Sequence, residues 1–109
     1  MTNGPEMMTA LGDPTRREIF ERLSARPSPV GELAASLPVS RPAVSQHLRV
    51  LRDVGLVRDE PAGTRRIYSV DHAGLAVLRT YLDQFWSRSL TAFAAHAQRE
   101  ETEDDANSD

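Results

Sequence analysis

One segment, residues 40–57, constrains the fold of this chain most strongly, because it reads as a single helix with two different faces. An apolar stripe recurs at helical spacing and consists of Val44, Leu48 and Leu51, with His47 and Val54 at its edges. Ser40 is a favourable N-cap, Pro42 falls in the first turn, and Gly55 stands where a capping glycine ends a helix. The segment therefore predicts one amphipathic helix with defined ends.

The opposite face of this predicted helix is polar and basic, and it consists of Arg41, Pro42, Ser45, Gln46, Arg49 and Arg52. Side chains such as Ser45, Gln46 and Arg41 can hydrogen-bond to the edges of bases in a DNA groove. Arg49 and Arg52 lie farther along the helix, where arginines can reach phosphates. We therefore expect this face to enter the major groove of DNA.

Three shorter helices are predicted ahead of this segment, over residues 6–11, 13–25 and 28–37. The second and third share a start signal, because Asp13 and Ser28 are capping residues that a proline follows. Pro38 ends the third helix, so only a short link separates it from the helix that begins after Ser40. Two helices joined by a turn of three to four residues are typical of a helix-turn-helix unit.

A β-hairpin is predicted after Gly55, where the apolar period changes. Its strands are expected over residues 56–60 and 65–70, with a turn over residues 61–64. A hairpin with arginines at its tip, directly after a DNA-reading helix, is a wing whose cations can follow a phosphate strand or enter a minor groove. The expected DNA contacts of the wing are Thr64, Arg65 and Arg66.

The longest helix is predicted from residue 72 to about residue 99, with Asp71 as its N-cap. Such a helix is roughly 40 Å long at about 1.5 Å per residue, and its apolar stripe is broader than a domain of this size can cover. We therefore expect a homodimer whose interface contains Met8, Leu78, Leu82, Phe85, Trp86 and Phe93. The predicted fold is mainly α, a winged helix-turn-helix with about five helices, and residues 1–99 form one DNA-binding and dimerisation domain.

The formal net charge of −3 hides an uneven distribution of charge. Residues 100–109 contain six acidic and no basic residues, so residues 1–99 keep 13 basic against 10 acidic groups, a net charge of +3. Six of the arginines fall within residues 41–66, against three acids. Positive charge is thus concentrated on the predicted DNA-binding elements, whereas residues 100–109 are expected to be a disordered acidic tail.

Several classes of function conflict with the sequence. The chain has no cysteine, which excludes disulfides, thiolate metal sites and cysteine nucleophiles. It has no apolar run of membrane-spanning length, so we expect a cytoplasmic protein without a membrane partner. Neither the spacing of a catalytic triad nor a glycine-rich phosphate loop occurs, and we expect neither an enzyme nor a cofactor. A winged helix that binds only proteins should lack a basic helix and wing, and this chain has both.

Four segments of the chain together form a recognisable pattern: Ala10-Leu11-Gly12-Asp13-Pro14-Thr15-Arg16, Val30-Gly31-Glu32-Leu33-Ala34, Val44-Ser45-Gln46-His47-Leu48-Arg49-Val50-Leu51 with Gly55-Leu56-Val57, and Gly63-Thr64-Arg65-Arg66-Ile67-Tyr68. In these segments the chain resembles the ArsR/SmtB family of bacterial winged-helix regulators. The segments occur in the family's order and cover roughly residues 8–95. The resemblance implies a symmetric dimer joined through its first and last helices, which binds an inverted repeat in double-stranded promoter DNA and represses transcription.

The chain departs from the family at the positions that sense metals. Ala34 and Ser36 occupy the positions where many members carry cysteines, and neither residue is a good soft-metal ligand. Other members bind zinc on the last helix through an Asp-x-His pair and two further ligands, whereas Asp71 here directly precedes His72. His96 and Glu100 could share a metal, but two ligands are too few for a tight zinc site. We therefore predict no metal site; a repressor that responds to a metal or a small unknown effector through the last helix is the alternative.

Overall fold

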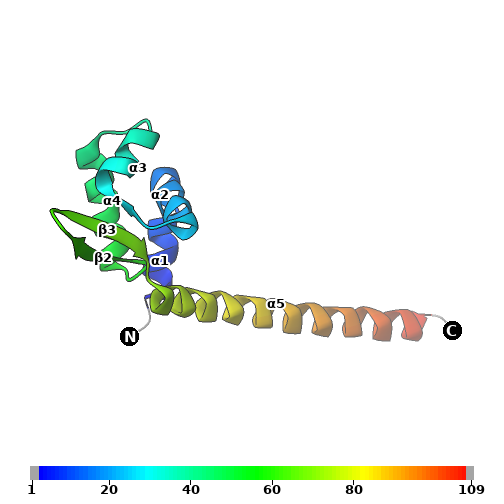
Figure 1. Ribbon diagram of the computed structural model, residues 1–109. Helices are drawn as coiled ribbons and strands as arrows, with labels where there is room; N and C mark the ends of the chain where they lie inside the picture. The colour runs from blue at the N-terminus through cyan, green and yellow to red at the C-terminus, as the bar shows by residue number, and fades with distance from the viewer. Residues whose placement is uncertain (1–2, 108–109) are drawn as a thin grey trace. The chain divides into compact units, whose positions relative to one another are not determined.

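The computed structural model describes residues 3–107, with side chains for residues 3–101. The elements in chain order are α1 (Gly4–Leu11), α2 (Pro14–Ala25), β1 (Ser28–Pro29), α3 (Val30–Ser36), α4 (Arg41–Asp53), β2 (Val57–Ala62), β3 (Arg65–Val70) and α5 (His72–Asn107) (Figure 1). Internal contacts divide the chain into two units, Met1–Leu78 and Arg79–Asp109. The first unit contains the helix-turn-helix and the wing. The described residues form five helices and a small sheet, so the predicted mainly α fold is confirmed.

Three predicted helix starts are confirmed by side-chain caps. The Asp13 carboxylate accepts a hydrogen bond from the Arg16 backbone N–H at 2.9 Å, and the Ser40 hydroxyl accepts one from the Ala43 N–H at 3.2 Å. The Asp71 carboxylate accepts from the N–H groups of the second and third residues of α5. Each cap satisfies backbone donors that the helix itself cannot pair, which stabilises a helix by roughly 1 kcal/mol.

The prediction that Ser28 caps a helix is wrong. Ser28 and Pro29 form the short strand β1, which pairs antiparallel with β3 through Tyr68 and Ile67. The helix α3 begins after Pro29 without a side-chain cap, and the Ser28 hydroxyl donates to the Arg26 carbonyl instead. The sheet order is β1-β3-β2, so β1 covers the edge of β3 that the hairpin leaves open.

The wing hairpin has a tighter turn than the sequence predicted. Ala62 pairs with Arg65, so only Gly63 and Thr64 lie between the strands. Gly63 has a φ of 64°, and Thr64 has no positive φ, which is the pattern of a type II′ hairpin turn. Pro61, predicted to lie in the turn, falls within β2, because an outer strand tolerates a residue that lacks an N–H group.

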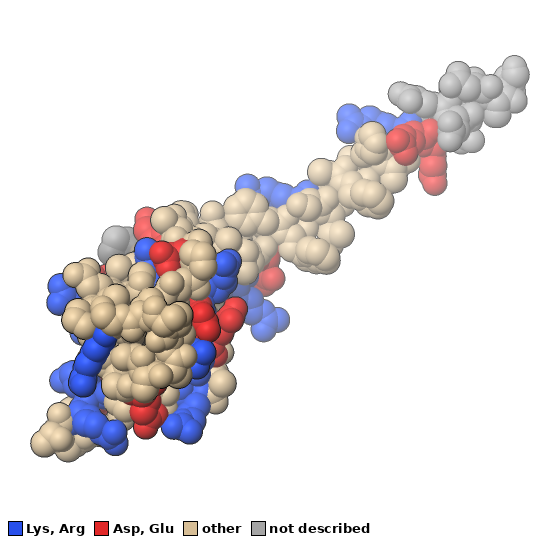
Figure 2. All heavy atoms as spheres, turned by 90° about the horizontal axis from the view of Figure 1, so that it is seen from above, with Lys and Arg blue, Asp and Glu red and all other residues tan. Residues whose placement is uncertain are grey.

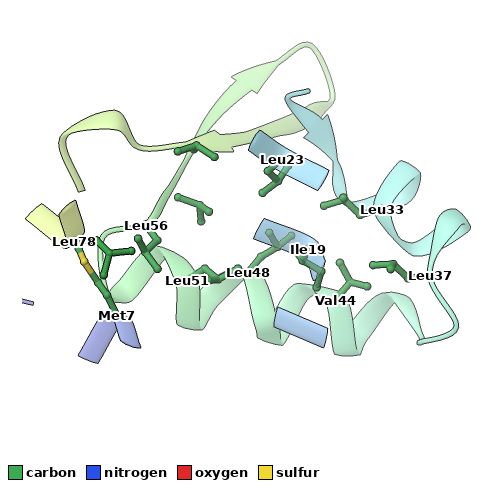
Figure 3. Packing of buried hydrophobic residues seen from close by; sticks show 12 residues of the cluster. Met7, Ile19, Leu23, Leu33, Leu37, Val44, Leu48, Leu51, Leu56 and Leu78 are labelled. Atoms are coloured by element: carbon green, nitrogen blue, oxygen red, sulfur yellow. The ribbon is translucent and has the colours of Figure 1, made fainter. Parts of the chain in front are cut away.

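The core of the first unit lies where α4 meets the other helices and the sheet. Its buried members are Met7, Ile19, Leu23, Leu33, Leu37, Val44, Leu48, Leu51, Leu56, Val57, Val70 and Leu78. Figure 3 shows Val44, Leu48 and Leu51 pointing from α4 toward the other labelled apolar side chains, and all three are completely buried. The predicted apolar stripe of α4 is therefore confirmed.

Leu78 belongs to this core, which corrects its assignment to the dimer interface. Its side chain is 6% exposed in the single chain, so no partner is needed to cover it. The apolar residues at the start of α5, including Leu78, have the same helical spacing as those farther along the helix. A periodic pattern shows which face of a helix is apolar, but it does not show which chain covers that face.

The helix α5 continues to Asn107, through most of the segment for which the sequence predicted disorder. An established helix gains one hydrogen bond for each residue added, and glutamate and alanine are favourable helix residues. Residues 108–109 lie outside the described residues. The prediction that residues 1–99 act as one domain depends on what covers α5 beyond Leu78, and it stays a prediction.

Candidate nucleic-acid interface

The side of α4 opposite the core is exposed along its whole length. Its exposed residues are Arg41, Pro42, Ser45, Gln46, Arg49 and Arg52. The burial of Val44, Leu48 and Leu51 fixes the rotation of the helix about its own axis, because all three must face the core. The structure therefore brings every α4 residue that the sequence predicted to contact DNA to one exposed face.

Within residues 3–101, three arginines of this region have no acidic partner: Arg41, Arg49 and Arg65. Arg41 lies at the start of α4, Arg49 lies two turns later, and Arg65 begins β3 at the tip of the wing. A guanidinium group without an internal acid can pair with a phosphate and does not first have to break an ion pair. We refer to these three residues as the unpaired arginines.

Arg52 and Arg66, which the sequence also predicted as DNA contacts, are bound to the same carboxylate. The Arg66 Nε donates to Asp59 Oδ2 at 2.6 Å, and Arg52 Nη1 lies 3.7 Å from Asp59 Oδ1. The hydrogen bond from Arg66 is the main cause that holds the pKa of Asp59 below its ordinary value, and the charges of both arginines act in the same direction. The carboxylate is therefore ionised at neutral pH and neutralises part of the charge of these two arginines.

The sequence did not predict that Asp59 pairs with two of the expected DNA contacts. In the hairpin register Asp59 pairs with Tyr68, so Arg66 is its diagonal neighbour on the same face of the two strands. That relation follows from the two-residue turn. The predicted turn over residues 61–64 would place Asp59 directly opposite Arg66 on the same face, so an acid and an arginine facing each other across the hairpin were the signal that could have found this pair.

A groove of about 510 Å³ joins the tip of the wing to the starts of α3 and α4. Its lining residues are Pro29, Val30, Gly31, Glu32, Ala35, Arg41, Thr64, Arg65, Arg66 and Tyr68. The acid among them, Glu32, pairs with Arg26 at 2.9 Å, outside the groove lining. The groove thus places Arg41 of α4 and Arg65 of the wing on one concave surface. Figure 2 shows basic and acidic side chains mixed over the face in view, so the pairing of each arginine decides whether it is available to a phosphate.

Most of the residues predicted to form a dimer interface are exposed. Met8 of α1 and Leu82, Phe85, Trp86 and Phe93 of α5 are all exposed large apolar side chains, as is Leu90. Trp86 is 67% exposed and Phe93 is 71% exposed. Phe85 has contacts within α5: its ring meets Tyr81 edge-on at 5.0 Å between ring centroids, and the Arg88 guanidinium lies 5.2 Å from the centroid of the Phe85 ring.

The positions related to metal sensing carry no set of ligands among the described residues. Ala34 is half-buried, Ser36 is exposed, and the Ser36 hydroxyl donates to the Leu33 carbonyl. On α5, His96 Nε2 lies 3.0 Å from Glu100 Oε1, and no third histidine or acid among the described side chains completes the pair. Across the described part of the chain, no helix is long and apolar enough to cross a membrane.

Comparison with known proteins agrees with this geometry. The family described as "Helix-turn-helix domain" matches residues 11–60. The chain is 65% identical over 85 residues to the HTH-type transcriptional regulator Rv2034 of Mycobacterium tuberculosis, which covers 78% of this chain and 79% of that protein. It is 32% identical over 62 residues to the transcriptional repressor SdpR of Bacillus subtilis, covering 57% and 69% of the two chains. A solved ArsR-like transcriptional regulator from Rhodococcus sp. RHA1 is 31% identical and superposes with a TM-score of 0.78 over 88% of this chain and 91% of its own.

Proposed function

We propose, from the premise that this chain belongs to the ArsR/SmtB family of winged helix-turn-helix transcriptional regulators, that two copies bind an inverted-repeat operator and repress transcription. The observation that carries the proposal is the exposed face of α4 together with the unpaired arginines. The core fixes this face, and the groove connects its first turn to the wing tip. A helix held in this way can insert into a major groove while the wing follows the adjacent backbone.

The proposal divides the interface into base contacts and phosphate contacts. Three residues lie in the first half of α4, Arg41, Ser45 and Gln46, and we assign them the contacts with base edges. Arg49 and Arg65 contribute phosphate contacts, which make the affinity depend on salt. Two observations support this part of the proposal: all five side chains are exposed, and the three arginines among them have no acidic partner within residues 3–101.

Arg52 and Arg66 have a different role in the proposal from the one the sequence suggested. Both side chains are about half exposed, so their free N–H groups can still meet a phosphate. Their bonds to Asp59 lower the gain from such a contact, because a phosphate must compete with an ionised carboxylate. We therefore assign them a smaller share of the salt-dependent affinity than Arg49 and Arg65.

The second copy of the chain is proposed to cover α5. The exposed stripe from Leu82 to Phe93 has the composition of an interface core, because large apolar and aromatic side chains dominate it. Met8 of α1 is also exposed and apolar, and we propose that the partner covers it as well. A homodimer related by a two-fold axis presents two α4 helices to the two halves of an inverted repeat. Repression then follows from occupancy of the promoter.

The proposed repressor does not sense metals through thiolates. The chain has no cysteine, and the residues at the corresponding positions are Ala34 and Ser36. The alternative, a metal or small molecule that acts through α5, has one geometric feature in its favour, the His96–Glu100 pair. Two ligands at the surface of one helix leave a metal largely hydrated, so the pair is not the basis of our proposal.

Replacing Gln46 and Arg65 separately by alanine is expected to distinguish the two kinds of contact. Gln46→Ala removes a bidentate partner for adenine, a contact that discriminates between bases by about 1–3 kcal/mol, so operator affinity falls while affinity for random DNA stays nearly constant. Arg65→Ala removes a charge at the wing tip, so it weakens binding to both duplexes. It also makes the slope of log affinity against log salt shallower by about one unit per chain.

The measurement is a titration of each variant on a selected operator and on a scrambled duplex at several salt concentrations. Arg99→Ala is the matched control, because it removes one exposed arginine from α5 outside the proposed interface. If Gln46→Ala weakens both duplexes equally, or leaves operator binding unchanged, Gln46 does not read bases.

A further inference from the structure

Asp59 connects the two parts of the proposed DNA interface. Its carboxylate binds Arg66 of β3 through Oδ2 and lies within ion-pair distance of Arg52 of α4 through Oδ1. The Asp59 side chain is only 9% exposed, although it belongs to β2, an outer strand of the sheet. One carboxylate therefore joins both strands of the wing to the second half of α4.

The position of the wing tip depends on how its base is held. Residues 61–66, which include the turn, are all exposed, so the tip is not packed against the rest of the first unit. Ala62, at the end of β2 and opposite Arg65, lies three positions after Asp59, which is roughly 10 Å of extended strand. A rotation of the hairpin by about 15° at Asp59 would thus move Arg65 by roughly 3 Å, which is the length of a hydrogen bond.

We propose that Asp59 is a positioning residue for DNA recognition, which holds the wing against α4 so that Arg65 and the reading face of α4 contact one duplex at the same time. This inference rests on the proposed function. In this proposal Asp59 itself makes no contact with DNA. It holds the guanidinium groups of Arg52 and Arg66 in place, and this fixes the position of Arg65 at the wing tip.

Simple electrostatics predicts the opposite effect of removing this carboxylate. An acid beside a DNA-binding surface repels phosphates, and its loss would also release two arginines to bind them. On that view Asp59→Asn should bind every duplex more tightly, with a steeper salt slope. The positioning role predicts weaker binding to the operator, so the direction of the change separates the two explanations.

The test compares Asp59→Asn with Glu60→Gln on two duplexes, one selected by the wild-type protein from a randomised pool and one scrambled. Glu60→Gln is a matched control, because it makes the same change of charge at the adjacent residue. Glu60 is exposed and pairs only with Arg58 of its own strand among the described residues. We expect Asp59→Asn to weaken operator binding about tenfold and to leave scrambled-DNA binding unchanged or up to threefold tighter. Glu60→Gln should change both affinities by less than about twofold.

A double-mutant cycle shows whether Asp59 acts through the wing tip. In the Arg65→Ala background, Asp59→Asn should weaken operator binding by less than about twofold, because the contact that it positions is already missing. Arg52→Gln is a second variant that breaks only the α4 side of the connection, and its operator-specific loss should shrink in the same background. A general loss of folded protein would lower binding to both duplexes equally, and thermal unfolding of each variant measures it directly.

Two results would overturn the inference alone: operator binding by Asp59→Asn that equals or exceeds wild type, or an equal loss with and without Arg65. A wild-type protein that selects no duplex would overturn the proposed function, and this inference with it. The first pair of results leaves the proposed function intact, so the two failures are distinguishable.

Discussion

Gly74→Ala is expected to destabilise the first unit by more than about 3 kcal/mol, or to prevent its folding, because there is no space for a methyl group. Gly74 is buried in the first turn of α5. A Cβ built on it would lie 1.6 Å from the carbonyl oxygen of Gly55 and 2.7 Å from its carbonyl carbon. Both atoms belong to the backbone, so no side-chain rotation can relieve the overlap.

The surrounding backbone cannot move aside easily. Gly55 has a φ of 88° where α4 ends. The next residue, Leu56, donates to the Leu51 carbonyl at 2.9 Å and accepts from the Asp71 N–H at 2.9 Å. A shift of Gly55 would break these bonds and displace a completely buried leucine. The fold thus depends on a close approach between the end of α4 and the start of α5.

Chemical denaturation followed by circular dichroism measures this effect. Gly63→Ala is the control, because none of the described atoms lies within 4 Å of a Cβ built on Gly63, although Gly63, unlike Gly74, has a positive φ that disfavours alanine. It should lose about 1–3 kcal/mol, the cost of holding an alanine at a positive φ. A Gly74→Ala protein that unfolds within about 1 kcal/mol of wild type would show that α5 does not approach Gly55 in this way.

Leu82→Asp is expected to dissociate the proposed homodimer and, as a consequence, to abolish tight operator binding. Leu82 lies within the exposed apolar stripe of α5. Burying an ionised carboxylate against apolar side chains costs several kcal/mol, so the dimer dissociation constant should rise at least about 100-fold. Operator affinity should fall as well, because two half-sites bound by linked subunits become two separate and weaker binding events.

Sedimentation velocity at micromolar protein concentration measures the change in oligomeric state. Gln84→Asp is the matched control: it adds the same carboxylate two residues farther along α5, about 200° around the helix from Leu82. The control should remain dimeric and should bind the operator. A wild-type protein that sediments as a monomer, or a Leu82→Asp variant that sediments as a dimer, would contradict the proposed interface.

Local signals made much of the fold predictable from the sequence. Val44, Leu48 and Leu51 are buried as predicted, because their spacing places all three on one face of an α-helix. Asp13 and Asp71 cap helices through bonds to residues two or three positions away, so the nearby sequence is sufficient to identify them.

Features that depend on distant partners were predicted poorly. The strand β1 exists because Ser28 and Pro29 meet Tyr68 and Ile67, about 40 residues later, and nothing in the sequence near Ser28 indicates this pairing. The charge pattern also does not show which acid pairs across the hairpin: Asp59 binds Arg66 of β3, whereas Glu60 pairs with Arg58 of its own strand.

The sequence predicted which residues are exposed on the proposed DNA-binding face better than it predicted which of the arginines pair with acids. Arginine content alone does not distinguish Arg65, which has no acidic partner among the described residues, from Arg66, which binds Asp59. The difference depends on three-dimensional pairing, and it changes which substitution should alter the salt dependence of DNA binding.

A titration of the wild-type protein tests the central claim most directly, with a selected duplex and its scrambled counterpart compared over a range of salt concentrations. The account predicts that the selected duplex is an inverted repeat, bound at least about 10³-fold more tightly than the scrambled one. It also predicts a slope of log affinity against log salt of about −4, since Arg49 and Arg65 of two chains supply four phosphate contacts. Equal affinity for the two duplexes, or an affinity that salt does not change, would contradict it.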